Sequence, residues 1–441
     1  MLTAQSNLTT RPYTHADQTL VAALRADQYR RWHAGDPRLS YPPQARRAAD
    51  RSLEEDAHLG ETWAAVAERA QPGAAPRVVG YLRAWWRRFG DRDAQLMWLP
   101  QRHLTCEVFF QFAAAAAEEP GAVFTQLFAA VQALTPAPPS EPWAVSLVPP
   151  GAGLDPALTA LGFRVTSVFA YRPGGTTPPP PPTPPLKGEG SMTTPPPTPP
   201  LKGGGSMTTP PPTPPLKGEG SIAPPFLRRE GGDGQTPVEL RTQNSELRTG
   251  VGGLGLSPPG WTIRPATRAD KPAIVGLYAD LCAYHSGNDP YADRPPPRLR
   301  EDFGYVISSV LAEPRRWALL VAHHTDSPTL RAFTLASVDR DEGGPAALTQ
   351  LPPGTVGFIH DFMIAEGVRR QGLGRALWAA TVAACASRAP RPPARGAMHG
   401  TWLVYRPSNP TGAHFWPALG YTPLYTMWRR GGWTADPADM V

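Results

Sequence analysis

Hydrophobic periodicity divides the last part of the chain into a regular series of strands and helices. Apolar side chains recur every three to four residues after Asp270, at Ile274, Leu277, Tyr278 and Leu281, and this spacing predicts an amphipathic helix that starts at Asp270. Three β-rich apolar runs then predict a meander of strands at 317–323, 331–339 and 355–365. The other elements expected here are strands at 262–264, 400–405 and 425–429 and helices at 298–312, 375–387 and 412–419.

The first part of the chain predicts the same elements in the same order. Strands are expected at 78–86, 105–112, 143–148 and 165–171, and a helix is expected at 122–134. Strands and helices that alternate in this way indicate the α/β class, here with a mixed, mostly antiparallel sheet flanked by helices.

Sequence identity between the two parts indicates an internal duplication. The stretch 11–17, RPYTHAD, shares Arg, Pro, Thr, Ala and Asp with the stretch 264–270, RPATRAD, at an offset of 253 residues. At the same offset, the predicted strand 107–112 falls under 360–365, and Gly121 falls under Gly374. Near the end of each part, Leu-Gly-Phe at 161–163 is repeated as Leu-Gly-Tyr at 419–421, five residues out of frame. We therefore predict two homologous domains, at 1–172 and 260–441.

Proline and glycine dominate residues 173–259, between the two predicted domains. The stretch 193–207 is repeated almost unchanged at 208–222, and 20 of the chain's 57 prolines lie in residues 173–225. Such a segment has too few apolar residues to form a core, so we expect a disordered Pro/Gly/Thr-rich repeat linker. Its Pro-x-x-Pro units would also suit an SH3-like partner, but a tether is the interpretation that we favour.

Composition argues against a nucleic-acid-binding protein, a membrane protein and a protein held by disulfides or a metal. The formal net charge is +6, but the basic doublets are scattered and form no continuous stripe, which argues against a nucleic-acid partner. No apolar run approaches the ~20 residues that span a bilayer, and the N-terminus lacks a signal-peptide pattern, so we expect no membrane contact and a cytoplasmic location. The three cysteines are too few for a disulfide scaffold, and no Cys/His cluster has the spacing of a metal site.

A basic, glycine-containing loop carries the strongest chemical signal. Residues 369–375, RRQGLGR, join the apolar strand at 355–365 to an alanine-rich helix. A turn of this kind offers backbone N–H groups and a helix N-terminus to a phosphate. Its spacing, R-x-x-G-x-G, differs from both the dinucleotide fingerprint and the nucleotide P-loop. The sequence therefore predicts a pyrophosphate site.

This loop resembles the acyl-coenzyme A loop of the GNAT N-acetyltransferases. Residues 409–421 resemble the last block of the same superfamily, with Asn409 after a strand, the aromatic pair Phe415-Trp416 in a helix, and Gly420 eleven residues beyond the Asn. Residues 261–270 also fit the family's opening strand and helix cap. The resemblance implies that 260–441 is a catalytic GNAT domain, which transfers an acetyl group from acetyl-CoA, as cosubstrate, to a primary amine.

The resemblance also implies where the coenzyme binds. In this family the fourth strand is opened by a bulge, and its backbone N–H groups bind pantetheine and polarise the thioester carbonyl. The residues expected to bind the coenzyme are Phe362, Met363, Ile364, Arg369, Arg370, Gln371, Gly372, Leu373, Gly374, Arg375, Asn409, Phe415 and Trp416.

The chain departs from the family at its catalytic positions. Several members have Glu where Phe358 stands here. Regular alternation is expected to place His360 on the face of Phe358 and Asp361 on the opposite face. With an ordinary pKa near 6.5, His360 is then the first candidate for the general base, with water as the alternative and Asp361 as a further candidate. Trp416 stands where the family often has a Tyr acid, so Tyr421, Tyr405 or His414 replaces it, or no acid is needed.

The first domain differs from the second at the loop. Residues 116–121, AAEEPG, stand where the second domain has its glycine loop. Two carboxylates there would repel a pyrophosphate, and Pro120 removes a backbone donor. We therefore expect a degenerate GNAT-like domain that lacks the R-x-x-G-x-G loop. This tandem layout resembles that of the mycothiol synthases, in which the C-terminal domain transfers the acetyl group.

The expected partners are acetyl-CoA and an amine acceptor, and a homodimer is compatible with this organisation. The aromatic-rich segments 284–294, 406–408 and 424–433 suit an amine or a cation held over rings. They do not choose between an aminoglycoside, a polyamine, an amino acid and a protein N-terminus. The alternative hypothesis is a non-catalytic acyl-CoA-binding or scaffolding pseudo-acetyltransferase.

Overall fold

The computed structural model describes residues 8–39, 61–88, 102–107, 112–136, 142–174, 257–288, 298–341, 354–389 and 398–431. The predicted linker lies outside these residues except at its two ends. Residues 289–294 and 432–433, which belong to two of the aromatic-rich segments expected to hold an amine, also lie outside them.

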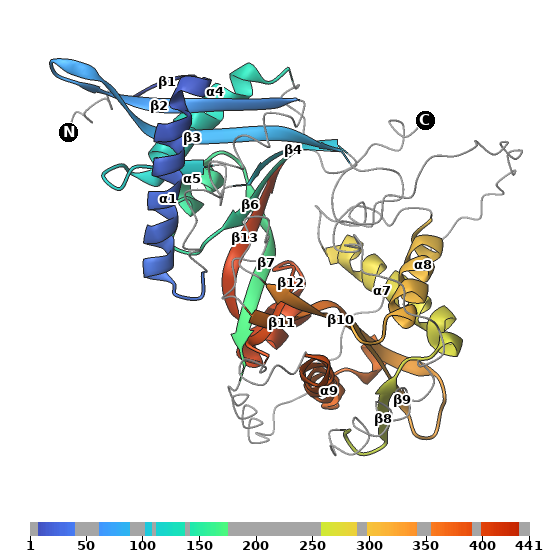
Figure 1. Ribbon diagram of the computed structural model, residues 1–441. Coiled ribbons are helices and arrows are strands. Elements are labelled where there is room, and N and C mark those ends of the chain that lie inside the picture. Colours follow the sequence, from blue (N-terminus) through green and yellow to red (C-terminus); the bar gives the residue numbers. More distant parts are fainter. Residues whose placement is uncertain are drawn as a thin grey trace, which may run out of the picture.

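The N-terminal half contains the elements expected from its sequence, with additional strands near its start (Figure 1). In chain order they are β1 (Leu8–Pro12), the 3-10 turn η1 (His15–Asp17), α1 (Gln18–Gly35), β2 (Thr62–Gln71), β3 (Ala74–Arg88), β4 (Arg102–Glu107), β5 (Phe112–Ala114), α4 (Pro120–Leu134), β6 (Trp143–Val148), α5 (Asp155–Ala160) and β7 (Arg164–Pro173).

Within the described residues, the C-terminal half repeats this order, with α8 in addition and with the single strand β11 where the N-terminal half has β4 and β5. Its elements are β8 (Trp261–Pro265), the 3-10 turn η4 (Arg268–Asp270), α7 (Lys271–Asn288), α8 (Leu299–Ala312), β9 (Trp317–His324), β10 (Leu330–Asp341), β11 (Gly354–Ile364), the 3-10 turn η5 (Glu366–Val368), α9 (Leu373–Arg388), β12 (Gly400–Tyr405), α10 (Pro410–Ala418) and β13 (Thr422–Arg430).

The duplicated motif forms the same local structure in both halves. Arg11 donates two hydrogen bonds of 2.7 Å to the carboxylate of Asp17, and Arg264 does the same to Asp270 at 2.7 and 2.8 Å. In each half a threonine forms a capping box with the aspartate, which starts the first helix. These fork-shaped ion pairs hold the pKa of both aspartates down, to about 2.

The sheet ladders correct one part of the predicted alignment. On β3, Gly80 pairs with Ala114 and Leu82 pairs with Phe112, as on β10 Ala332 pairs with Ile364 and Thr334 with Phe362. Residues 112–114 therefore take the place of 362–364, and the predicted offset of 253 is wrong at this strand. The loop to the next helix is three residues shorter in the N-terminal half, so that the offset of 253 returns at Gly121.

Within the described residues, thirteen strands form one continuous sheet, with β5 paired to β3 beside the main order β1-β2-β3-β4-β6-β13-β7-β12-β11-β10-β9-β8. The last strand of each half lies inside the other half's part of the sheet (Figure 1). β13 pairs with β6 and β7, and β7 pairs with β12 and β13. A long linker alone would leave the two domains free to rotate, and it is this exchange of strands that fixes them relative to each other.

Helices cover both faces of the sheet. On one face, α4 and α5 pack on the N-terminal strands and α9 and α10 on the C-terminal strands. On the other face, α1 and the pair α7 and α8 cover the two ends. The cross-strand row Trp317, Ser337, Phe358, Trp402 and Tyr171 joins these two ends, because directly paired residues point to the same face. No helix in the described ranges is long and apolar enough to cross a membrane.

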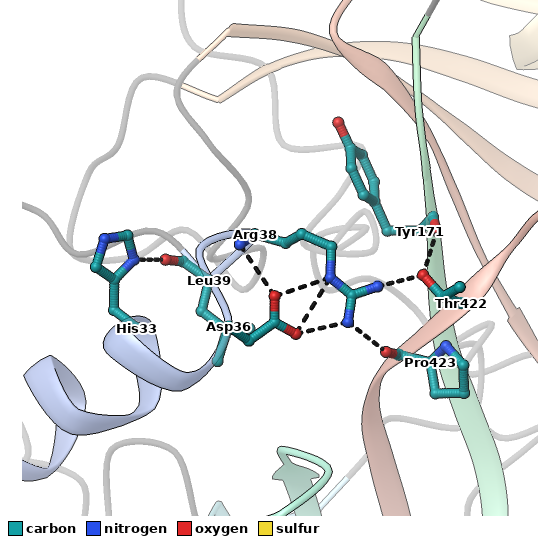
Figure 2. Close-up of polar contacts among 7 residues, drawn as sticks. All are labelled: His33, Asp36, Arg38, Leu39, Tyr171, Thr422 and Pro423. Carbon is teal, nitrogen blue, oxygen red and sulfur yellow. Dashed lines mark hydrogen bonds and ion pairs between the residues drawn. The ribbon is translucent and has the colours of Figure 1, made fainter. Parts of the chain in front are cut away.

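Residues after α1 fasten the N-terminal half to β13. Figure 2 shows Arg38 between Asp36 and two residues of the other half, donating to the hydroxyl of Thr422 and, at 3.0 Å, to the carbonyl of Pro423. The hydrogen bonds from Arg38 lower the pKa of Asp36, which keeps this pair ionised. Leu39 follows and is buried against Tyr171, Leu424 and Tyr425. The residues that follow α1 therefore pack against the strands where the two halves meet.

Candidate functional site

A β-bulge opens β11 at His360. Asp361 pairs with Leu335 and Ile359 pairs with Ala336, so His360 is the extra residue. On the other edge, the parallel ladder with β12 runs from Val356 to Ile359 and stops there among the described residues. In the described part of the chain, the backbone of β11 beyond Ile359 therefore has no strand partner on the β12 side.

The bulge reverses the predicted faces of β11 from Asp361 onward. Ile359 packs in the core under α9, and after the bulge Phe362 and Ile364 contact the same core. Met363 packs under α7 and α8, and Asp361 lies near Tyr278 and Cys282 on α7. His360 lies on the face of Phe358, beside Trp317, but the expectation that Asp361 lies on the opposite face is wrong. The added residue places His360 and Asp361 together on the α7 face.

His360 is held as a neutral ring. Its Nε2 lies 2.9 Å from the hydroxyl of Ser337, which in turn donates to the carboxylate of Asp339 at 2.8 Å. Because the hydroxyl has only one proton to donate, Nε2 is the donor to Ser337. The ring packs 4.0 Å from that of Phe358, and burial together with nearby Arg316 lowers the pKa of His360 to about 3. The expected pKa near 6.5 is therefore wrong.

Asp361 has the titration behaviour that was expected of His360. Its side chain keeps a partly accessible surface but is enclosed by protein on most sides, and burial raises its pKa to about 7. Within the described part of the chain, no side chain or backbone group donates a hydrogen bond to this carboxyl. A carboxyl group with a pKa near 7 and an accessible surface can exchange a proton with a ligand at neutral pH.

The glycine loop leads into an uncapped helix. Gly372 has a φ of +81°, a left-handed conformation that favours glycine, and stands at the N-cap of α9. Among the described residues, no N-cap side chain bonds to the first N–H groups of α9. A Cβ at Gly374 would lie 3.3 Å from the ring of Phe415, so glycine also permits the close approach of α10. This helix start is open to an anion.

Arg369 and Asn409 hold the loop in place. Arg369 donates from Nε to the carbonyl of Ile364 at 3.1 Å, and its guanidinium lies 5.1 Å from the ring centre of Tyr284 on α7. The hydroxyl of Tyr284 is 3.5 Å from Oδ1 of Asn409, which also caps α10 by accepting from the N–H of Gly412. Tyr284 therefore links the two predicted motifs, a role that nothing in its sequence spacing indicated.

The predicted aromatic wall assembles beside the open strand. The ring of Phe362 lies 5.6 Å from Phe415 and 5.2 Å from Trp416. Tyr421 is nearby but fully enclosed, with its hydroxyl bonded to Trp378 and Thr401, and burial raises its pKa to about 12. The structure therefore brings His360 and Asp361 together and leaves Tyr421 in the core on the opposite face.

Residues 282–421 match the model of the acetyltransferase (GNAT) family. The C-terminal half carries a GNAT domain. Among solved structures, the chain is similar to a GCN5-related N-acetyltransferase from Sphaerobacter thermophilus, at 14% identity and a TM-score of 0.46 over 97% of this chain and 99% of that chain. It is also similar to a tandem GNAT protein from the clavulanic acid biosynthesis pathway, at 12% identity and a TM-score of 0.36 over 97% and 100% of the two chains. An aminoglycoside N-acetyltransferase in complex with CoA is 16% identical over 37% of this chain and 89% of that chain, with a TM-score of 0.28. No curated protein sequence matches the chain.

The N-terminal half keeps the element order of the GNAT domain but fills the corresponding positions with its own side chains. The carboxylate of Glu119 accepts from the N–H groups of Gly121 and Ala122, at the start of α4. The amide of the buried Gln28 donates to the carbonyl of Phe112 at 2.9 Å and accepts from the N–H of Ala114 at 2.7 Å. These are the counterparts of the open helix start and the open strand of the GNAT domain.

Proposed function

We propose that this protein is an N-acetyltransferase, in which residues 260–441 transfer an acetyl group from acetyl-CoA to a primary amine. The observation that carries this proposal is the carboxyl of Asp361, which has a raised pKa and lies at the bulge where β11 parts from β12. Residues 1–172 are proposed as a degenerate copy, with residues 173–259 as a linker.

The residues of the GNAT domain fit an acyl-coenzyme A. Two sites that would meet its phosphates and its pantetheine arm, the start of α9 and the unpaired edge of β11, lack the side chains that fill their counterparts in the N-terminal half. We propose that the backbone of 372–375 and the exposed Arg370 hold the pyrophosphate. The backbone of 362–364 would hold pantetheine, with Phe415 and Trp416 as an apolar wall.

When bound, acetyl-CoA supplies the thioester that the amine attacks. An amine must lose a proton to become a nucleophile, and Asp361, which is about half ionised at pH 7, accepts that proton. His360 has a different task. Fixed by Ser337 and packed against Phe358, its neutral ring excludes water from the carboxyl and so maintains the raised pKa of Asp361. Arg369 and Asn409 keep the loop and α10 in position.

Calorimetric titration of acetyl-CoA into the full chain tests the coenzyme site. We expect one site per chain, and binding at least about 30-fold weaker in Gly372→Glu, because a carboxylate would stand at the start of α9. Gly367→Glu is a matched control, since Gly367 lies in the same loop with open space around it. Equal binding by wild type and Gly372→Glu would contradict the proposed loop.

Thiol release in the presence of amines then tests turnover. We expect acetyl transfer by the wild type and its loss in Asp361→Asn, with coenzyme binding retained. Binding without transfer to any amine would instead support the non-catalytic acyl-CoA binder.

A further inference from the structure

An aromatic strip crosses the junction between the two halves on the α7 face of the sheet. We define it as Phe169 on β7, Trp402 on β12, and Phe358 and His360 on β11. The rings of Phe358 and Trp402 stack at 3.8 Å with an angle of 12°, and those of Phe169 and Trp402 are nearly parallel at 6.5 Å. The strip therefore begins on a strand of the N-terminal half and ends beside Asp361.

The members of the strip differ from the aromatic residues around them in exposure. Each of the four keeps a partly accessible side chain, whereas Tyr171, Tyr425 and Trp317 beside them are 3%, 2% and 4% exposed. The buried rings thus flank the strip on the same face of the sheet. Four neighbouring accessible rings, of which the last precedes the carboxyl of Asp361, form a continuous apolar path to that group.

Few carboxylates beside the strip can meet a ligand. On this face, the described residues of β10 and β11 next to the strip include two carboxylates, Asp339 and Asp361, and Asp339 is already engaged by the hydroxyl of Ser337 and by Arg316. A ligand with several ammonium groups needs several carboxylates to replace its hydration. With Asp339 held by Ser337 and Arg316, Asp361 is the carboxyl that stands ready for a ligand among these described residues.

We propose that the aromatic strip binds the acceptor and that the acceptor is a primary monoamine with a flat apolar body. Its amine lies at Asp361, and its body stacks on Phe358, Trp402 and Phe169. This inference rests on the proposed acetyl transfer at Asp361. It also gives the N-terminal half a part in specificity, because Phe169 belongs to β7, whose position beside β12 depends on the exchange of strands.

The test uses the full chain with CoA present, tryptamine as the flat monoamine and spermidine as the polyamine, with binding followed by calorimetry. We expect tryptamine to bind at least about tenfold more tightly than spermidine. Phe169→Leu and Trp402→Leu keep an apolar side chain in the fold, and each should weaken tryptamine binding about tenfold. Tyr305→Ala, which removes a ring that is 68% exposed on α8, should change it less than about twofold.

Tighter binding of spermidine, or unchanged tryptamine binding in both leucine variants with an intact melting temperature, would overturn the inference. Because the readout is binding, it separates this inference from the proposed function. If tryptamine binds through the strip but no acetyl group is transferred, the proposed function fails and the strip remains a binding site. If spermidine is acetylated and tryptamine does not bind, the function stands and the inference fails.

Discussion

The guanidinium of Arg172 lies 4.9 Å from the ring centre of Trp378, which joins the last strand of the N-terminal half to α9 of the C-terminal half. The reverse contact also exists. Arg430, at the end of β13, lies 4.8 Å from the ring centre of Phe128 on α4. Burial lowers the pKa of both arginines. Each half therefore places a cation from its final strand against an aromatic ring of the other half's core, and the two halves stabilise each other.

Replacing either arginine should destabilise the whole chain. We expect Arg172→Ala and Arg430→Ala each to lower the free energy of unfolding by about 1–2 kcal/mol, the value of a desolvated cation–π contact. Urea unfolding followed by tryptophan fluorescence should show one transition, and its midpoint should move to a lower urea concentration in both variants. Arg30→Ala serves as the control, since the Arg30 side chain is 62% exposed. Two separate transitions, with each variant displacing only one, would contradict joint folding.

Cutting the linker should not separate the halves. With a protease site inserted between residues 175 and 256, we expect both fragments to remain together in size-exclusion chromatography, because β7 and β13 stay paired within the sheet. The isolated fragment 257–441 should be destabilised, since β12 and β13 lose β7 between them. Separation of the fragments under native conditions is the result that would count against the exchange of strands.

The stability of Asp361 and His360 variants should depend on pH with opposite signs. With a folded pKa of about 7, Asp361 keeps a proton between pH 4 and 7 that the unfolded chain has lost, so its contribution to stability falls as pH rises, by about 1.4 kcal/mol per unit. With a folded pKa of about 3, His360 stays neutral between pH 3 and 6.5 while the unfolded chain is protonated, so its contribution rises with pH.

In the wild type, the pH dependences of stability that come from Asp361 and His360 partly cancel, and each variant removes one of them. Relative to wild type, Asp361→Asn should gain stability as pH rises from 4 to 7, and His360→Gln should lose stability over about the same range. Urea titrations at half-unit steps of pH measure both. If the free energy of unfolding changes with pH in the same way in the wild type and in Asp361→Asn, burial does not raise the pKa of this carboxyl.

Catalysis should depend on the same carboxyl. We expect kcat/KM to rise with pH through an apparent pKa near 7 in the wild type, because the ionised form of Asp361 is the base. Asp361→Asn should lower kcat by about 100- to 10,000-fold. Glu366→Gln, an exposed carboxyl in the turn that follows β11, is the matched control. If the dependence of kcat/KM on pH is unchanged in Asp361→Asn and its fall at low pH disappears only in His360→Gln, His360 is the base instead.

Gln28 should stabilise the N-terminal half rather than serve a ligand. Gln28→Ala leaves the buried carbonyl of Phe112 and N–H of Ala114 without their partner, which we expect to cost about 2–4 kcal/mol. Gln71→Ala, at the exposed end of β2, should have little effect. Acetyl-CoA stoichiometry should remain one in Gln28→Ala, because Glu119 still occupies the start of α4. A second coenzyme site in this variant would contradict the degenerate role of this half.

Short-range patterns predicted those features that depend on neighbouring residues. The caps at Asp17 and Asp270, the glycine loop at Gly372 and the helix and strand order all depend on contacts within a few positions of the chain. Periodicity and turn chemistry report such contacts directly. Duplicated motifs then predicted that two parts of the chain fold alike.

The sequence by itself therefore determined the fold class, the two related halves, the glycine loop before α9 and the absence of that loop's R-x-x-G-x-G pattern from the first half. Only the tertiary structure decided which face Asp361 occupies, because the bulge at His360 depends on pairing with β10. The tertiary structure also decided the pKa values of His360 and Asp361, since burial is a property of the packed core. The exchange of β7 and β13 arises from strand pairing between distant segments, and no local pattern encodes which neighbour an edge strand will take.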